Sequence, residues 1–313
     1  MTKTFSDYEA PESAPHSQLV ASVVSDVGEI MLRPNRKGQG FKLLDGAEGF
    51  GPPDVANELI PYEGHRGAIL ATQRETEGDM FLPIQISSST KAEVRRLKDR
   101  LSKVLKPAEG TARVVLTDPV TGVGRYREVA YRDGLSAPMW QSPYAAAFGV
   151  TVDFMDPWAY SLQEFEQTLD VAPGATGGMR TPVRFPIRFS RTPGARGRWA
   201  TNEGTDPAPV TLRFNGPVTD PVVSLEGHWT FRVSGTLAWD EYLVIDSRAR
   251  TAYVFSTTRA SVRRTAYQMI RSGSKFSDLL LPPGQHGLRF EANDPSFQAS
   301  VTVTWPATYR SME

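Results

Sequence analysis

The residue types that could carry out chemistry are few in this 313-residue chain, and their spacing joins none of them into a catalytic set. The absence of cysteine excludes disulfides, thiolate nucleophiles and cysteine-based zinc sites. No serine lies in a Gly-x-Ser-x-Gly elbow. The histidines are far apart and lack the spacing of metal ligands: His16, His65, His228 and His286. We therefore expect no metal site and no cofactor.

Carboxylates are the remaining candidates, because a pair of them could hydrolyse a glycosidic bond. Asp240, Glu241 and Asp246 are the best placed, but Asp246 begins a hairpin turn, where aspartate serves the backbone. The Gly122–Gly124 stretch lacks the third glycine and the lysine of a phosphate loop and falls in a predicted hairpin. The sequence thus predicts no catalytic, cofactor-binding or metal-binding residues. An enzyme, a glycosidase or esterase, remains an alternative through the three carboxylates alone.

The composition favours a mainly β protein. Gly 26 and Pro 24 are spread along the chain, as in proteins built from short strands joined by turns. Lys+Arg 35 balances Asp+Glu 35, so the chain has no broad positive field to attract nucleic acid. No stretch approaches the ~18 apolar residues of a membrane span, and residues 1–17 contain no apolar signal segment. We expect synthesis in the cytoplasm, no membrane partner and a flexible N-terminus over 1–17.

A first domain is predicted over 18–162, as a β-sandwich or β-barrel-like unit. Valine and isoleucine residues predict a strand that ends near Leu32, and a long loop with short strand pieces follows over 34–67. Further strands are expected at the ranges that follow, the first two forming a pair through a turn at Glu77–Asp79: 68–75, 80–87, 113–117, 125–132 and 146–154.

One helix, at about 90–106, interrupts these strands. Thr90 and Glu93 form a capping box, and the apolar stripe comprises Val94, Leu97, Leu101, Val104 and Leu105. The other face is strongly basic, with two acids, Glu93 and Asp99, against Lys91, Arg95, Arg96, Lys98, Arg100, Lys103 and Lys106. We expect the stripe to cover a sheet and the basic face to be solvated or to lie at an interface.

The C-terminal part is predicted to be a jelly-roll β-sandwich over 201–313, after a Pro/Gly-rich connection over 163–200 that contains one strand at 183–189. Its strands recur at a spacing typical of sandwiches: 210–214, 222–225, 229–233, 242–246, 251–255, 287–291 and 299–305. A basic tract from Arg259 to Lys275 is interpreted as an exposed loop with a short strand. Aromatic residues crowd this domain, and core packing is expected for most of them: Trp199, Phe214, Trp229, Phe231, Trp239, Tyr242, Tyr253 and Phe255.

The order of these elements resembles the distal tail (minor tail) protein family of siphophages. The strongest stretch, 202–221, carries the family's N-x-G turn, P-x-P-V strand entry and G-P-x-T-x-P turn. These correspond to Asn202, Gly204, Pro207, Pro209, Val210, Gly216, Pro217, Thr219 and Pro221. Residues 242–246 resemble the next hairpin, and 279–286 resemble an L-x-P-G-x-N turn in which His286 stands where asparagine is usual. Asp156–Trp158 resembles the end of the family's first domain.

The resemblance implies a structural virion protein without catalytic residues. It implies a hexameric ring formed by the domain at 18–162, which docks on the tail tube and joins it to tail-tip, baseplate, fibre or receptor-binding proteins. The tape measure protein is a further implied partner, and DNA passes through the lumen in transit. The second domain is galectin-like in this family. The alternative function is a carbohydrate-binding β-sandwich module of a cell-surface protein, on the strength of the aromatic residues.

Overall fold

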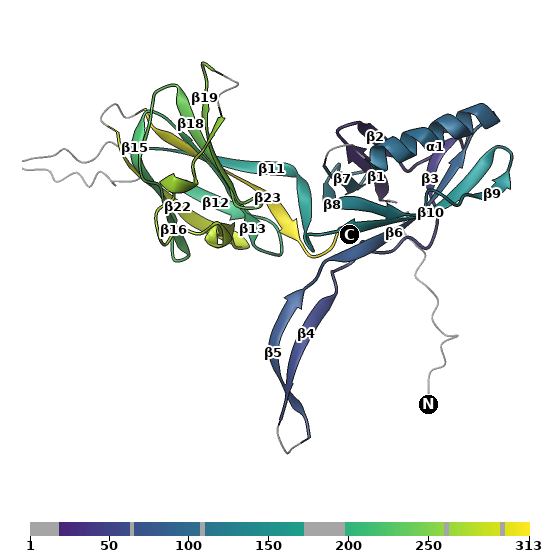
Figure 1. Cartoon of the computed structure of the whole chain (residues 1–313), viewed down its shortest axis with the longest axis horizontal. Coiled ribbons are helices and arrows are strands. Elements are labelled where there is room, and N and C mark those ends of the chain that lie inside the picture. The colour runs from purple at the N-terminus through teal and green to yellow at the C-terminus, as the bar shows by residue number, and fades with distance from the viewer. Residues whose placement is uncertain (1–18, 63–65, 107–109, 172–197, 260–262, 295–297) are drawn as a thin grey trace, which may run out of the picture. The chain divides into compact units, whose positions relative to one another are not determined.

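The computed structural model describes residues 19–62, 66–106, 110–171, 198–259, 263–294 and 298–313. The chain divides into two compact units (Figure 1): unit 1 comprises Met1–Leu162 with Arg310–Glu313, and unit 2 comprises Gln163–Tyr309. Most described residues lie in antiparallel strands, so the expected mainly β fold is confirmed. The expected flexible segment at 1–17 and strand at 183–189 lie outside the described residues.

Unit 1 is built on one strongly curved antiparallel sheet in the order β2-β1-β7-β8-β10-β6-β3, with β9 beside β10. Its strands are β1 (Val20–Ser25), β2 (Gly28–Met31), β3 (Gly40–Leu43), β6 (Gly78–Ser87), β7 (Ala112–Thr117), β8 (Gly124–Asp133), β9 (Met139–Ser142) and β10 (Ala145–Phe154). The expected strand ending near Leu32 is instead the β1–β2 hairpin.

The two ends of this sheet are joined through Leu32. Its N–H donates to the carbonyl oxygen of Ala21 at 2.8 Å, and its own carbonyl oxygen accepts from the N–H of Leu43 at 3.2 Å. Because these bonds connect β1 with β3, the sheet closes on itself, in keeping with the expected barrel-like form.

Helix α1 (Lys91–Leu105) matches its predicted position and N-cap residue, but the Glu93 carboxylate accepts from the Ser88 hydroxyl at 2.5 Å. The Thr90 hydroxyl accepts from the N–H of Glu93 at 3.3 Å, which satisfies one of the unpaired donors of the first turn. Val94, Leu101, Val104 and Leu105 are buried. The helix contacts β1, β2 and β6, so its apolar stripe covers the sheet as expected.

The expected pairing of 68–75 with 80–87 is wrong. Strand β5 (Ala68–Glu75) pairs with β4 (Val55–Pro61), whereas β6 pairs with β3 and β10. The reason is burial, since β6 alternates completely buried side chains with outward ones and must lie in the middle of the sheet. Gly78 belongs to β6 rather than to a turn. A β-carbon at this strand position would lie 2.6 Å from the Phe154 ring.

Unit 2 is a sandwich of two antiparallel sheets with its core between them. One sheet has the order β23-β14-β18-β19-β20 and the other β12-β22-β15-β16, with β17 beside β15. The strands are β12 (Arg198–Asn202), β14 (Thr211–Asn215), β15 (Val218–Leu225), β16 (Trp229–Arg232), β17 (Thr236–Leu237), β18 (Glu241–Asp246), β19 (Thr251–Ser256), β20 (Arg263–Thr265), β22 (Gly284–Asn293) and β23 (Ser300–Tyr309). A small pair, β13 (Ala208–Pro209) and β21 (Leu280–Leu281), and two short 3₁₀ turns, Tyr267–Met269 and Phe276–Asp278, complete it.

The bounds of unit 2 differ from the predicted 201–313 at both ends. The start of the expected connection is strand β11 (Ala159–Asp170), which pairs with β8 at Tyr160 and continues into unit 2 beside β23. The last four residues return to unit 1, where Met312 is buried and its N–H donates to the carbonyl oxygen of Phe50 at 2.9 Å.

The turn motifs at 202–221 lie where segments of the unit 2 backbone approach one another closely. The side-chain amide of buried Asn202 donates to the carbonyl oxygens of Asp206 and Leu281, at 2.8 and 2.9 Å. A β-carbon on Gly204 would lie 2.2 Å from the Thr308 carbonyl oxygen, and one on Gly216 would lie 1.9 Å from that of Ala238. Only glycine fits at either position, so these motifs are requirements of the fold.

Candidate assembly surfaces

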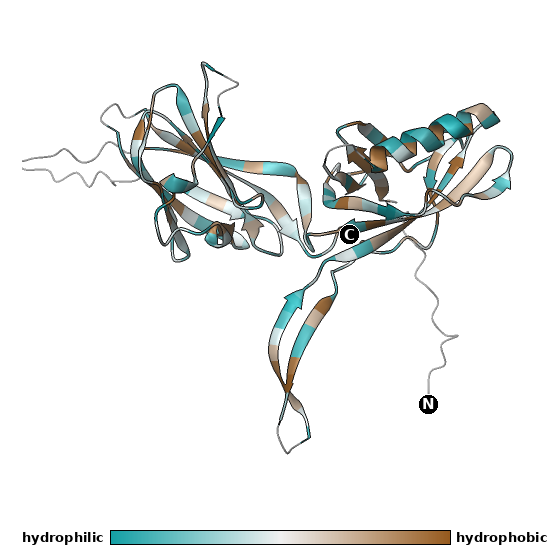
Figure 2. Cartoon of the chain, viewed as in Figure 1, coloured by the Kyte–Doolittle hydropathy of each residue, from teal (hydrophilic) through white to brown (hydrophobic). Residues whose placement is uncertain are grey.

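The arm, which we define as β4 and β5, is the most exposed element of unit 1. It forms a separate two-stranded sheet in which every residue of β4 is exposed, as is every residue of β5 before Glu75. Figure 1 shows it as a ribbon of two strands, and Figure 2 shows hydrophobic residues along its length. An isolated two-stranded hairpin is at best marginally stable in water, so the arm is a candidate assembly surface.

Both faces of the arm carry uncovered apolar pairs. Leu59 lies opposite Leu70 and Ile60 opposite Ile69, and the four side chains are between 51% and 60% exposed. Because successive residues of a strand point to opposite faces, one pair lies on each side of the ribbon. A partner that covered only one face would leave the other pair in water.

Arg127 holds the base of the arm. Its buried guanidinium donates to the carbonyl oxygens of Gly49 at 2.7 Å, Gly51 at 2.9 Å and Arg310 at 2.8 Å. Burial lowers the pKa of Arg127 to about 10, an effect that the nearby Asp156 opposes, so the group stays charged at neutral pH. The loop leading into β4 and the C-terminal return are therefore fixed to β8 by one side chain.

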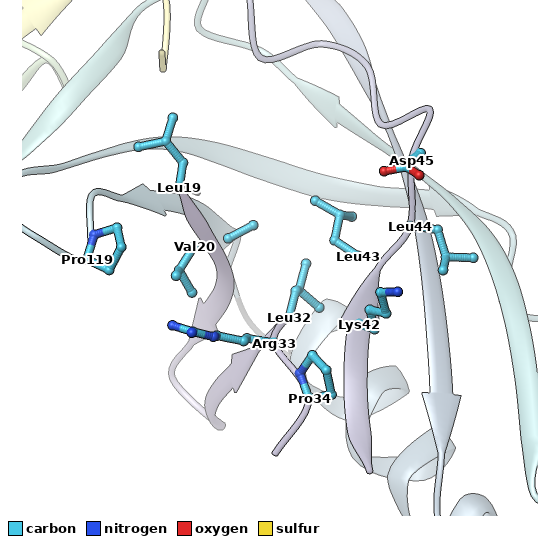
Figure 3. A pocket seen from close by; sticks show the side chains of 11 residues that line it. Leu19, Val20, Leu32, Arg33, Pro34, Lys42, Leu43, Leu44, Asp45 and Pro119 are labelled. Atoms are coloured by element: carbon cyan, nitrogen blue, oxygen red, sulfur yellow. The ribbon is translucent and has the colours of Figure 1, made fainter. Parts of the chain in front are cut away.

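A hollow of about 740 Å³ lies in unit 1 near the junction of β1 and β3. Figure 3 shows Leu19, Leu32 and Leu43 around it, with the cationic side chains of Arg33 and Lys42 close by. The recess is open and combines aliphatic side chains with the charged ones of Arg33, Lys42 and Asp45, so it can receive a segment that carries both apolar and polar groups.

The candidate carboxylates each have a structural role. Asp240 accepts hydrogen bonds from the hydroxyls of Thr258 and Ser256, which lower its pKa. Glu241 pairs with Arg264 at 3.1 Å. Asp246 accepts from the N–H groups of two residues of the turn after β18, both at 2.9 Å. Asp246 ends the strand that Glu241 begins, so the three do not converge on one site.

Two histidines that are far apart in sequence meet in unit 2. The rings of His228 and His286 are 4.9 Å apart in an edge-to-face arrangement, while His16 and His65 lie outside the described residues. The pair joins the turn after β15 to the start of β22, a contact that no local pattern indicates. Among the residues the structure describes, no group of three or more His, Asp or Glu is placed to hold a metal ion.

The expected core packing of most of the eight aromatic residues is wrong, because only three of them are buried. Phe214, Phe231 and Trp229 lie in the core. The rings of Tyr242 and Phe255 stack across β18 and β19 at 5.3 Å. Tyr242, Tyr253 and Phe255 are half-buried on the outward face of β18 and β19. Trp199 and Trp239 are 61% and 74% exposed.

The two basic regions differ in their partners. In the tract around β20, Arg264 pairs with Glu241, Arg271 with Asp220 at 3.7 Å, and Arg263 lies over the ring of Tyr253 at 3.4 Å. No ion pair to a carboxylate is found for any helix α1 cation within the described part of the chain. No described helix is long and apolar enough to cross a membrane.

Comparisons with known proteins agree on one fold. No protein-family model matches the sequence, and no curated protein matches it either. The crystal structure of the SPP1 Dit protein, described as a paradigm of hub adsorption apparatus in phages that infect Gram-positive bacteria, is similar with a TM-score of 0.58. It is 12% identical, and the match covers 92% of this chain and 99% of that one.

A chain of the phage P2 baseplate in its activated conformation is also similar, in structures with Ca and with Sr. Each match has a TM-score of 0.54 and 10% identity, and covers 91% of this chain and 97% of the other. At such identities the likeness concerns the fold, and it extends over both units. The chain therefore has the fold of the Dit-type distal tail proteins of bacteriophages, as its turn motifs indicated.

Proposed function

We propose that this chain is a structural protein of a phage tail tip, a distal tail protein without catalytic function. In this role unit 1 of several copies, six in the family that the sequence resembles, forms a ring at the distal end of the tail. The ring joins the tail tube to tail-tip, baseplate or receptor-binding proteins, contacts the tape measure protein during assembly and lets DNA pass. The fold shared with the SPP1 and P2 proteins supports this role.

The arm is the observation that carries the proposal. Its two apolar pairs are exposed on opposite faces, and its base is fixed by Arg127. An exposed apolar ribbon is a liability in a monomer, because its strand edges and side chains promote aggregation. In a ring, a neighbouring copy would cover the arm, and the hollow beside Leu32 and Leu43, which is lined in part by aliphatic side chains, offers one candidate surface for it.

The test is the oligomeric state of the purified chain, by light scattering and negative-stain electron microscopy. The wild-type chain is expected to form closed rings. Leu59→Glu places a charge in the covered interface and removes a leucine from it. Loss of a buried leucine weakens association by about 1.5–3 kcal/mol per contact, which raises the dissociation constant roughly ten- to a hundredfold.

Asn57→Glu is the matched control, because residue 57 lies two positions from Leu59 on the same strand and receives the same charge. It is expected to weaken association less than Leu59→Glu, because it removes no apolar side chain from the covered arm. A wild-type chain that remains monomeric at high concentration, or rings that survive Leu59→Glu unchanged, would contradict the proposal.

A carbohydrate-binding module is the second candidate, favoured by Trp199. This exposed ring lies opposite Gly287 across β12 and β22, and an exposed indole offers a face on which a sugar ring can stack. Glu226 and Arg289, paired at 2.6 Å, supply polar groups nearby. A glycan array on which the chain and its Trp199→Ala variant give the same signal would remove this candidate.

A further inference from the structure

We propose that helix α1 and hairpin β9–β10 form a docking surface for an acidic protein segment with an apolar or aromatic anchor residue. The surface comprises Lys91 and Arg95 on α1 and Trp140 on β9, and we call it the α1–β9 surface. It lies wholly within unit 1 and does not depend on ring formation.

The first observation is the hollow between helix and hairpin. Lys91, Arg95, Trp140 and residues 141–143 line a space of about 530 Å³. Trp140 is 52% exposed although it lies on a strand. Tryptophan and arginine are the residues most enriched at the centres of protein interfaces, where a ring fills a pocket and a guanidinium binds carboxylates.

The second observation is uncompensated charge. Lys91 and Arg95 lie one helical turn apart on one flank, and like charges at this spacing destabilise a helix. The next two cations of this flank contact aromatic rings instead of carboxylates. The Lys98 ammonium lies 5.6 Å from the centre of the Phe148 ring. The Lys106 ammonium lies 4.1 Å from the centre of the Tyr131 ring. A partner that supplied carboxylates would remove the repulsion.

The chain's neutral balance argues for protein over nucleic acid as the occupant. The chain has 35 basic and 35 acidic residues, so its positive charge is local to the helix. Proteins that bind nucleic acid usually carry a positively charged groove that follows the nucleic-acid backbone. One hollow beside one tryptophan fits a single anchoring side chain flanked by acids, which is how short protein segments bind.

Hairpin β9–β10 is held in place, so the surface exists before a partner arrives. The side-chain amide of Gln85 on β6 donates to that of Gln141, and the N–H of Ser88 donates to the carbonyl oxygen of Tyr144 at 3.0 Å. Little ordering is therefore required on binding, which favours affinity.

The test uses fluorescence anisotropy of the full chain with three labelled probes. One is a glutamate- and aspartate-rich peptide with a central Phe-Leu pair, the second is the same peptide with Ser-Ser in place of Phe-Leu, and the third is an oligothymidylate. We expect the anchored peptide to bind most tightly, and its affinity to fall as salt is added.

Lys91→Glu/Arg95→Glu is expected to weaken binding of the anchored peptide about tenfold or more. Trp140→Ala is expected to reduce its affinity to that of the Ser-Ser peptide. The control Arg36→Glu/Lys37→Glu changes the net charge of unit 1 equally, at exposed positions between β2 and β3, and is expected to bind as the wild type does.

Four results would overturn the proposal. They are absence of binding by the anchored peptide, equal binding of the oligothymidylate, an equal loss in the control variant, and a changed oligomeric state of Lys91→Glu/Arg95→Glu by light scattering. The last would make the surface a contact between copies of this chain. Failure of the proposed ring is detected separately, because the wild-type chain is then monomeric whatever it binds.

Discussion

The arm of unit 1 and hairpin β18–β19 of unit 2 are built from similar residues but differ in how far these residues are buried. Both are antiparallel ribbons with aliphatic cross-strand pairs. Leu243 and Ile245 are completely buried in the sandwich core, whereas Leu59 and Ile60 are more than half exposed. The hydrophobic pattern of a hairpin thus does not tell whether its own chain buries it, because burial depends on which elements lie beside it.

This difference separates stability from assembly. Apolar side chains in β18–β19 contribute to the free energy of unfolding of the chain itself, since folding removes them from water. Those of the arm contribute only when a partner covers them. The four changes below test the comparison through the free energy of unfolding.

The largest loss is expected for Ile245→Ala. Removing a completely buried isoleucine leaves a cavity and costs about 2–5 kcal/mol. Chemical denaturation followed by tryptophan fluorescence measures it, with Val244→Ala on the outward face of the same strand as control. Equal losses for the two variants would show that the two faces of β18 do not differ as described.

Arg127→Met is expected to cost about 1.5–3 kcal/mol, because three backbone carbonyls lose a charged donor. Since those carbonyls flank the arm and the C-terminus, limited proteolysis should cut near the base of the arm sooner than in the wild type. An unchanged cleavage pattern would mean that the arm is held by other contacts, such as the 2.9 Å bond from the N–H of Thr76 to the Asp54 carbonyl oxygen.

Asp246→Ala is expected to cost about 1 kcal/mol, since two N–H groups of the turn lose their acceptor. Asp246→Asn keeps an acceptor oxygen and should retain most of the stability, which thermal unfolding can compare. A loss as large as that of Ile245→Ala would show that the hairpin depends on its turn rather than on its buried face.

Leu59→Ala is expected to change the free energy of unfolding by less than about 0.5 kcal/mol. The measurement requires a concentration at which light scattering shows monomers, so that assembly does not contribute. A loss of several kcal/mol would break the comparison, because it would mean that the arm is packed on its own chain.

The features that the sequence predicted are those that local patterns determine. The capping residues Thr90 and Glu93 and the stripe from Val94 to Leu105 specify helix α1 within sixteen residues of chain. Alternation identified β10 and most strands of unit 2. The turns at Asn202 and Gly216 pointed to the Dit-type fold because close backbone approaches admit only certain residues there.

Features that depend on distant parts of the chain were missed. Strand β5 was predicted to pair with β6, which follows it directly in sequence, but it pairs with β4. Hydrophobic periodicity does not identify which strand is the partner. The return of residues 310–313 to unit 1 and the meeting of His228 with His286 leave no local signal. The hollow beside Trp140 also combines elements some fifty residues apart, which a helical pattern alone cannot reveal.

The C-terminal return has a consequence for synthesis. A growing chain emerges from the ribosome N-terminus first, so residues 310–313 reach unit 1 only after all of unit 2 has been made. Until then Arg127 lacks the Arg310 carbonyl and Phe50 lacks the N–H of Met312. A chain that stops before residue 310 therefore lacks both bonds at the base of the arm.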